Sequence, residues 1–139
     1  MTGKMNADTL KVLLVRSGQE AVETEVEDTL KAKQEMVGGW IEMIMPFDDE
    51  AAIICNEEGK ILGLPMNRAL RNEEGKVIDI VCGDFFICYA PRDSEDFLSL
   101  PPEMMQKYKE KFRYPERFYI VDNEIYPVKY HPSKEEMER

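Results

Sequence analysis

Two short stretches carry side chains that could bind an anion, and the first lies at residues 64–71. There Asn67 offers a hydrogen-bond donor and an acceptor, and Arg68 offers a planar guanidinium suited to phosphate or carboxylate. Pro65 fixes the backbone before them, which predicts an irregular or short helical segment presenting both side chains at a binding site. A structural interpretation competes: the two residues hold their own segment together by bonding backbone carbonyls and Glu42.

The second stretch, residues 108–119, alternates cations with aromatic rings. Cations attract anions, and aromatic rings stack on bases, so a small nucleotide is a suitable ligand. We expect Arg113, Tyr114 and Arg117 to converge with Asn67 and Arg68 on one concave surface, which a second copy of the chain could complete. The alternative is an amphipathic helix with a solvated lysine face, followed by a strand.

Glu42 is the one polar residue in the apolar run at residues 40–47. A carboxylate in apolar surroundings has a raised pKa and could act as a general acid or base. Glu42 could instead lie on a wet face of its strand or pair with an arginine, and the same holds for Asp79. Because nucleophile elbows, phosphate loops, dinucleotide fingerprints and histidine pairs are missing from the sequence, we lean towards a protein that is not an enzyme.

The charge balance is acidic, with 18 basic and 28 acidic residues giving a net charge of −10. This balance argues against binding to duplex nucleic acid or to an anionic membrane, because both need clustered lysine and arginine. It allows a second class of function, in which carboxylates such as Asp48, Asp49 and Glu50 imitate nucleic acid towards a host protein.

The three cysteines, Cys55, Cys82 and Cys88, occur in apolar contexts without metal-ligand spacing. They predict reduced thiols in the core of a cytoplasmic protein. The single histidine, His131, stands in a polar stretch. We therefore expect neither a metal site nor a cofactor.

The order of apolar and turn-forming segments predicts an α+β fold: a single domain with a mostly antiparallel β-sheet of six to eight strands and two principal helices. The domain is expected at residues 9–130, between a flexible leader at 1–8 and a polar tail at 131–139. The helices are expected at 29–37, capped by Asp28 and ended by Gly38, and at 102–112. A tight hairpin is expected at Asp122 and Asn123.

The five residues Asn-Glu-Glu-Gly-Lys occur twice, at 56–60 and at 72–76. Asparagine initiates turns by bonding its own backbone, and glycine tolerates a positive φ. We predict two hairpin turns with Gly59 and Gly75 as their positive-φ residues. A calcium loop needs a different spacing of acids, which excludes one here.

Residues 9–120 resemble an uncharacterised domain-of-unknown-function family carried by phages, plasmids and integrated elements of Gram-positive bacteria. Four features carry the resemblance: Gly38 to Glu42, Asn56 to Gly59, Pro65 with Asn67 and Arg68, and Gly83 before an apolar strand. The resemblance implies an accessory role on a mobile element and supplies no catalytic residues.

The amino-acid sequence is compatible with two alternative functions. The first is a non-enzymatic counter-defence protein in the bacterial cytoplasm that sequesters a small anionic, nucleotide-like ligand. Its expected ligand-binding residues are Glu42, Asn67, Arg68, Arg113, Tyr114 and Arg117. The alternative is an acidic antagonist that binds a host defence enzyme.

Overall fold

A computed structural model describes residues 8–132, so residues 1–7 of the leader expected at 1–8, and residues 133–139 of the tail expected at 131–139, lie outside the described residues. Within residues 8–132 there are nine strands and two helices. Their bounds are β1 Thr9–Val15, β2 Val22–Glu27, α1 Leu30–Val37, β3 Ile41–Ile44, β4 Ala51–Asn56, β5 Met66–Arg71, β6 Val77–Cys82, β7 Phe85–Tyr89, α2 Pro102–Lys111, β8 Glu116–Val121 and β9 Glu124–Lys129.

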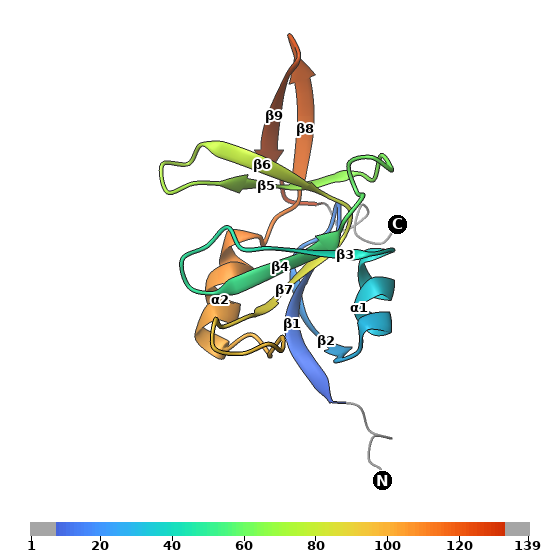
Figure 1. The fold of residues 1–139 in the computed structure, drawn as a ribbon. Coiled ribbons are helices and arrows are strands. Elements are labelled where there is room, and N and C mark those ends of the chain that lie inside the picture. The colour runs from blue at the N-terminus through green and yellow to red at the C-terminus, as the bar shows by residue number, and fades with distance from the viewer. Residues whose placement is uncertain (1–7, 133–139) are drawn as a thin grey trace.

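The strands form one five-stranded sheet and two separate hairpins (Figure 1). The large sheet has the order β2-β1-β7-β4-β3, and the hairpins are β5-β6 and β8-β9. Every pairing of these strands is antiparallel. The predicted α+β fold with a mostly antiparallel sheet and two principal helices is therefore confirmed, although the described residues hold more strands than expected.

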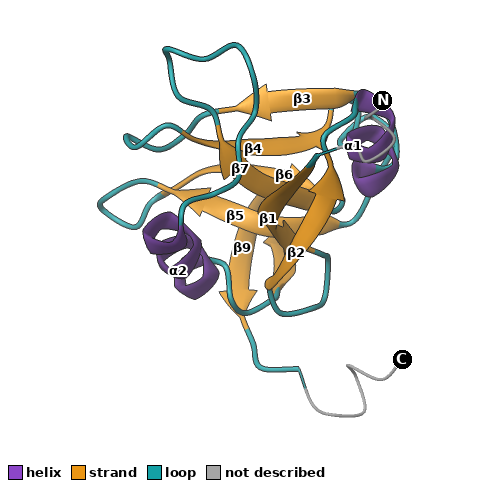
Figure 2. Ribbon diagram, turned by 90° about the horizontal axis from the view of Figure 1, so that it is seen from below, coloured by secondary structure: helices purple, strands orange, loops and turns teal. Residues whose placement is uncertain are grey.

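The central strands of the sheet are buried on both faces, because each face has its own apolar cover (Figures 1 and 2). In β4, alternate residues enter different cores: Ile53 lies in one and Ile54 in the other. Helix α2 and the β5-β6 hairpin cover the first face through residues such as Tyr108 and Leu70. Helix α1 covers the second face, where Val37 is buried. Neither helix in the described part of the chain is long and apolar enough to cross a membrane.

Helix α1 begins one residue later than predicted. Thr29 is its N-cap, and its hydroxyl accepts a hydrogen bond from the N–H of Ala32 at 3.1 Å. Asp28, the expected cap, instead forms an ion pair with the buried Lys33 at 2.7 Å. Gly38 ends the helix with a φ of 80°, as its position in the sequence predicts.

Residues 66–71 form a strand, so the prediction of an irregular or helical segment is wrong. Strand β5 pairs with β6 and buries its four middle residues. Asn67 and Arg68 look like surface residues in the sequence, but in β5 they are buried and form hydrogen bonds inside the protein.

The two Asn-Glu-Glu-Gly-Lys copies differ in structure. The copy at 72–76 is a hairpin turn between β5 and β6: Gly75 has a φ of 82°, and the Asn72 side chain accepts hydrogen bonds from the N–H groups of Glu74 and Lys76. The copy at 56–60 leads into a run of turns that connects β4 to β5, which are not paired. The hairpin predicted there is wrong, and Gly59 lacks the expected positive φ.

The β8-β9 hairpin closes at Asp122 and Asn123, with φ values of 51° and 66°. These values fit the two-residue turn that the sequence predicts. Figure 1 shows this hairpin projecting away from the large sheet, beyond β5 and β6.

Candidate functional site

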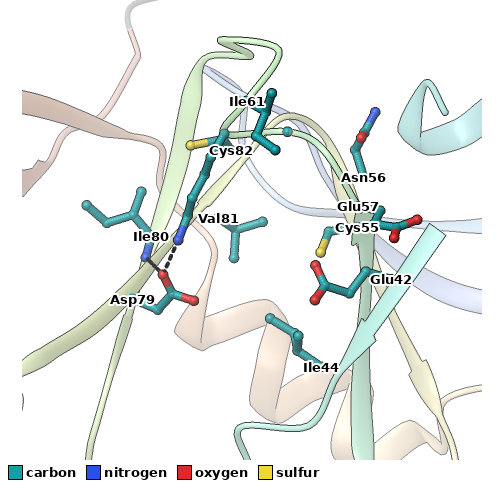
Figure 3. A pocket seen from close by; sticks show the side chains of 12 residues that line it. Glu42, Ile44, Cys55, Asn56, Glu57, Ile61, Asp79, Ile80, Val81 and Cys82 are labelled. Atoms are coloured by element: carbon teal, nitrogen blue, oxygen red, sulfur yellow. Dashed lines mark hydrogen bonds and ion pairs between the residues drawn. The ribbon is translucent and has the colours of Figure 1, made fainter. Parts of the chain in front are cut away.

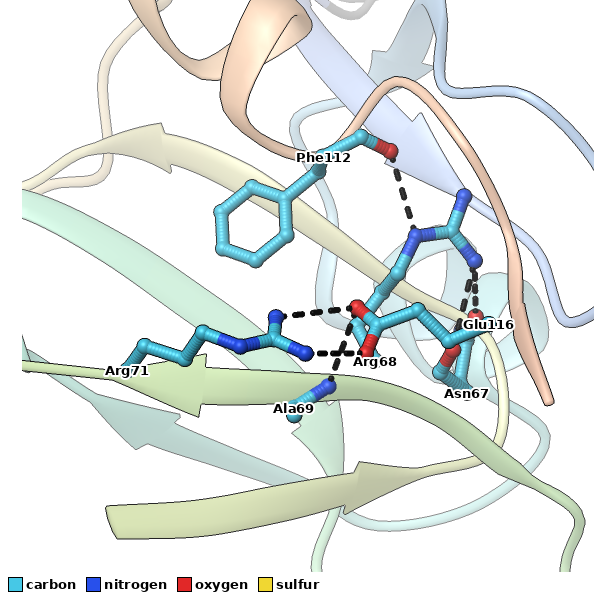
Figure 4. A network of polar contacts seen from close by, with 6 residues as sticks. All are labelled: Asn67, Arg68, Ala69, Arg71, Phe112 and Glu116. Atoms are coloured by element: carbon cyan, nitrogen blue, oxygen red, sulfur yellow. Dashed lines mark hydrogen bonds and ion pairs between the residues drawn. The ribbon is translucent and has the colours of Figure 1, made fainter. Parts of the chain in front are cut away.

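Asn67 and Arg68 are buried inside the protein rather than displayed on a loop (Figure 4). Their relative exposures are 1% and 0%. The Asn67 amide donates to the carbonyls of Val15 and Gly83, both at 2.9 Å. These two residues therefore present no surface to a ligand, and the expected exposed loop is corrected to a buried strand.

The guanidinium of Arg68 bonds backbone carbonyls from distant segments. Its Nε donates to the carbonyl of Phe112 at 3.1 Å, and a terminal nitrogen donates to that of Gln19 at 2.6 Å. Burial lowers the pKa of Arg68 to about 10, while the negative charge of Glu116 opposes this change. Arg68 thus stays protonated at neutral pH and ties three parts of the fold together.

Glu116 links the start of β8 to β5 (Figure 4). Its carboxylate accepts from the Arg71 guanidinium at 2.9 and 3.4 Å and from the N–H of Ala69 at 3.3 Å. The Glu116 side chain is 2% exposed and that of Arg71 is 24% exposed. Glu116 therefore neutralises the charge of Arg71, while part of the Arg71 side chain remains exposed to solvent.

The other residues predicted to bind the ligand in the second stretch, Arg113, Tyr114 and Arg117, lie at or near the surface. The Arg113 side chain is 56% exposed and lies 3.4 Å from a carboxylate oxygen of Glu20. The Tyr114 ring packs against His131, with ring centroids 3.8 Å apart. The Arg117 guanidinium lies over the ring of Tyr130 at 4.0 Å. Because Arg68 is enclosed, these residues do not form one concave surface with it.

Glu42 lines a cleft of about 300 Å³ between β3, β4 and β6 (Figure 3). Cys55 lies directly opposite Glu42 in the β3-β4 pair. Burial, and then the charges of Glu42 and Asp79, raise the pKa of the Cys55 thiol to about 11. Asp79 is held by Lys60 at 2.6 Å.

This acidic cleft does not suit an anion, since Glu42, Glu57 and Asp79 face it against a single lysine. Burial also raises the pKa of the two thiols that line it, Cys55 and Cys82, which disfavours the thiolate form. The three cysteines are free, as expected, with Cys55 and Cys88 buried. Within residues 8–132, no group of three or more histidine, cysteine or acidic residues is arranged to hold a metal ion.

A different cleft, here called the lysine cleft, lies between α2, the segment after β3 and the β5-β6 turn. Its volume is about 330 Å³. Its basic and aromatic lining residues are Phe47, Arg71, Lys107, Tyr108 and Lys111. Asp48, Asn72 and Glu73 also line it, and the carboxylates of Asp48 and Glu73 place acceptors for a base's amino groups beside the cations.

Lys111 differs from the other cations of this cleft because it has no carboxylate partner among the described residues. Arg71 is paired with Glu116, and Lys107 lies 3.1 Å from Asp49. The Lys111 ammonium lies 5.9 Å from the ring centroid of Phe47. Burial, and then the charges of Lys129, Lys107 and Arg71, lower the pKa of Lys111. A bound anion would relieve this crowding of positive charge.

The sequence contained one signal of the lysine cleft that was not used. Lys107 and Lys111 are four residues apart in α2, so both project from the same side of the helix. Like charges at this spacing repel each other and destabilise a helix. A pair of this kind therefore suggests a function for the two lysines. Phe47 and Arg71 could not have been assigned to this site, because they come from segments far away in the sequence.

Comparison with protein families finds that residues 10–113 match the family described as "Domain of unknown function (DUF3846)". No curated protein and no solved structure matches the chain. The match covers the large sheet, both helices and the residues lining the lysine cleft, and it ends before β8. Since it spans most of the 139 residues, the chain belongs to the DUF3846 family of domains of unknown function.

Proposed function

We propose that this protein binds a small anionic, nucleotide-like ligand in the lysine cleft and holds it without changing it chemically. The role would be that of an accessory protein encoded by a phage or another mobile element. In the bacterial cytoplasm, withholding a signalling nucleotide would counter a host defence system. Glu42, Arg113, Tyr114 and Arg117 remain predicted contacts of lower rank, because they lie outside this cleft.

The observation that carries the proposal is the state of Lys111. Its ammonium group lies among the positive charges of Arg71, Lys107 and Lys129 and has no carboxylate partner within residues 8–132, which is electrostatically unfavourable even at this partly exposed position. Phosphate or carboxylate would offset that cost by a charge-assisted hydrogen bond. This feature is unusual in a chain with a net charge of −10, in which acids outnumber bases.

The size and lining of the cleft limit the ligand. A volume of about 330 Å³ is near the lower end of the range for small-molecule sites, which begins at about 300 Å³. A mononucleotide is therefore preferred to a dinucleotide. The phosphate would lie at Lys107 and Lys111, while the carboxylate of Glu73 would accept a hydrogen bond from the amino group of a base.

The proposal can be tested by native mass spectrometry of the protein purified from bacteria. We expect a small phosphorylated molecule bound to the protein, with recovery of that molecule intact after the protein is denatured. Recovery of a cleaved product would instead identify an enzyme. A preparation without bound molecules, which also fails to bind any of a panel of mononucleotides, would contradict the proposal.

The alternative antagonist function has weaker support. Of the three acids expected to imitate phosphates, Asp49 accepts hydrogen bonds from Tyr108 and Lys107. Glu50 accepts from the N–H of Arg92 at 2.6 Å. These carboxylates are used within the fold, so we do not propose them as a docking surface.

A further inference from the structure

The β8-β9 hairpin exposes an unusual amount of apolar surface. Six of its apolar side chains are between 39% and 66% exposed: Tyr119, Ile120, Val121, Ile125, Tyr126 and Val128. They lie on both faces of a two-stranded hairpin that projects from the body of the protein (Figure 1). A two-stranded hairpin is at best marginally stable in water without further packing, so this one needs a partner surface.

The two edges of the hairpin are not equivalent. The N–H of Tyr130 donates to the carbonyl of Pro115 at 3.0 Å, in the same register as the pairs of the hairpin. Counting in twos from that pair makes Val121 and Glu124, which flank the two-residue turn, a pair of the hydrogen-bonded type. Hydrogen-bonded pairs alternate with open pairs in an antiparallel ladder, so Phe118 and Ile120 direct their backbone groups outwards from β8.

On the β9 edge, the corresponding residues are Ile125 and Pro127. Proline has no N–H to donate, and proteins use it to protect a strand edge from pairing. Strand β8 carries no such block at Phe118 or Ile120. Only the β8 edge of this hairpin can therefore accept a full further strand.

The charge of the hairpin also favours contact with another copy. Residues 116–129 contain three acids and two bases, so they account for only −1 of the net charge of −10. Two copies that meet at this hairpin keep their acidic bodies apart. The hairpin also follows the family match at residues 10–113 and is separate from the lysine cleft's α2 lining.

We propose that β8 pairs antiparallel with β8 of a second copy of this chain, giving a four-stranded sheet with the order β9-β8-β8-β9. A two-fold axis perpendicular to the strands makes two identical strands antiparallel and brings the same edge of each together, so one exposed edge is enough to form a closed dimer. The side chains of Tyr119, Ile120 and Val121 then gain neighbours from the partner copy.

The exposed area predicts a dimer of modest affinity. Only three of the six exposed apolar side chains, Tyr119, Ile120 and Val121, lie on β8, so pairing at this edge covers on the order of 200–300 Å² of apolar surface per copy. A standard interface buries about 800 Å² per partner. We therefore expect assembly in the micromolar range of protein concentration and independently of ligand binding.

Hydrogen exchange of backbone amides tests the pairing directly. We expect the amides of Phe118 and Ile120 in the full-length protein to become protected as its concentration rises from about 1 to about 500 μM, a range set by the weak-interface estimate. Their protection would track the dimer fraction measured by analytical ultracentrifugation. A protein that is monomeric throughout, or a dimer in which these two amides still exchange freely, would overturn the proposal.

Two substitutions distinguish pairing at the β8 edge from non-specific association through exposed apolar side chains. Ile120→Lys places a charge on the β8 edge and should abolish assembly. Ile61→Lys is the matched control, because Ile61 is 83% exposed and lies far along the chain in the turns after β4. Dimerisation that survives Ile120→Lys, or that both substitutions reduce equally, would contradict pairing through β8.

Discussion

Arg68 donates a hydrogen bond from its Nε to the backbone carbonyl of Phe112 across 3.1 Å, joining the middle of β5 to the end of α2. Phe112 is the C-cap of α2, where carbonyls lack partners within the helix. An arginine that has no exposed surface thus completes a helix end and fixes the hairpin β5-β6 against the first core.

Replacing Arg68 with Met should destabilise the protein strongly. The substitution leaves the buried carbonyl of Phe112 without its donor, which costs about 1–3 kcal/mol, and it also removes the hydrogen bond to the part-buried carbonyl of Gln19. We expect the free energy of unfolding in urea to fall by about 2–4 kcal/mol. Arg92→Ala, at an exposed position, is the control and should change it by less than about 0.5 kcal/mol. A loss below about 1 kcal/mol for Arg68→Met would refute this role.

The two repeated glycines should respond differently to substitution. A Cβ on Gly59 would lie 2.6 Å from the backbone carbonyl oxygen of Cys82, whereas a Cβ on Gly75 would meet nothing within 4 Å. Asparagine tolerates the positive φ of Gly75. Gly75→Asn should therefore shift the melting temperature little, while Gly59→Asn and Gly59→Ala lower it clearly. Equal shifts at both positions would show that the close approach at Gly59 is unimportant.

Tyr108 should make the protein more sensitive to acid. Burial raises the pKa of Asp49, but hydrogen bonds from Tyr108, Lys107 and Ala51 outweigh it and lower this pKa below 3.8. A lowered carboxylate pKa stabilises the fold at pH values above the unfolded-state pKa. That stabilisation is lost as the pH falls through the folded-state pKa.

Tyr108→Phe removes the largest of these lowering hydrogen bonds. The variant should lose about 1 kcal/mol of unfolding free energy at pH 7, and its difference from the parent protein should shrink near pH 2.5. Urea unfolding at both pH values measures this. Tyr119→Phe, at a half-exposed ring, is the control. A difference that does not depend on pH would exclude the Asp49 explanation.

The sequence predicted the antiparallel sheet, both helices and the final hairpin because these depend on local signals. Apolar alternation and the helical period mark the elements, while Gly38 and Asp122-Asn123 mark their ends. Partners from distant segments are invisible to such signals. The first Asn-Glu-Glu-Gly-Lys copy resembles the second, yet β4 pairs with β3 and β7, so no hairpin forms there.

The surroundings of the candidate site residues were predicted less well, for a related reason. Asn67 and Arg68 look like surface residues because burial of an arginine requires carbonyl acceptors, and here these come from Gln19 and Phe112, more than 40 residues away. In contrast, Lys111 was recognised within a basic stretch, but its lack of a carboxylate partner depends on how α2 packs beside Phe47 and Arg71.

The most direct test of the proposed function compares two lysines on one helix. Lys111 lines the lysine cleft and has no carboxylate partner in the part of the chain that the structure describes, while Lys109 lies 3.1 Å from Glu23 outside that cleft. Binding of AMP, with inorganic phosphate as the minimal probe, would be followed by the backbone amide shifts of α2 in the parent protein, Lys111→Ala and Lys109→Ala. One charge-assisted hydrogen bond is worth about 1.5–3 kcal/mol, so Lys111→Ala should weaken binding about ten- to a hundredfold, while Lys109→Ala leaves it unchanged. Equal affinities in the two variants, or no shifts in the parent protein with either probe, would contradict an anion site in the lysine cleft.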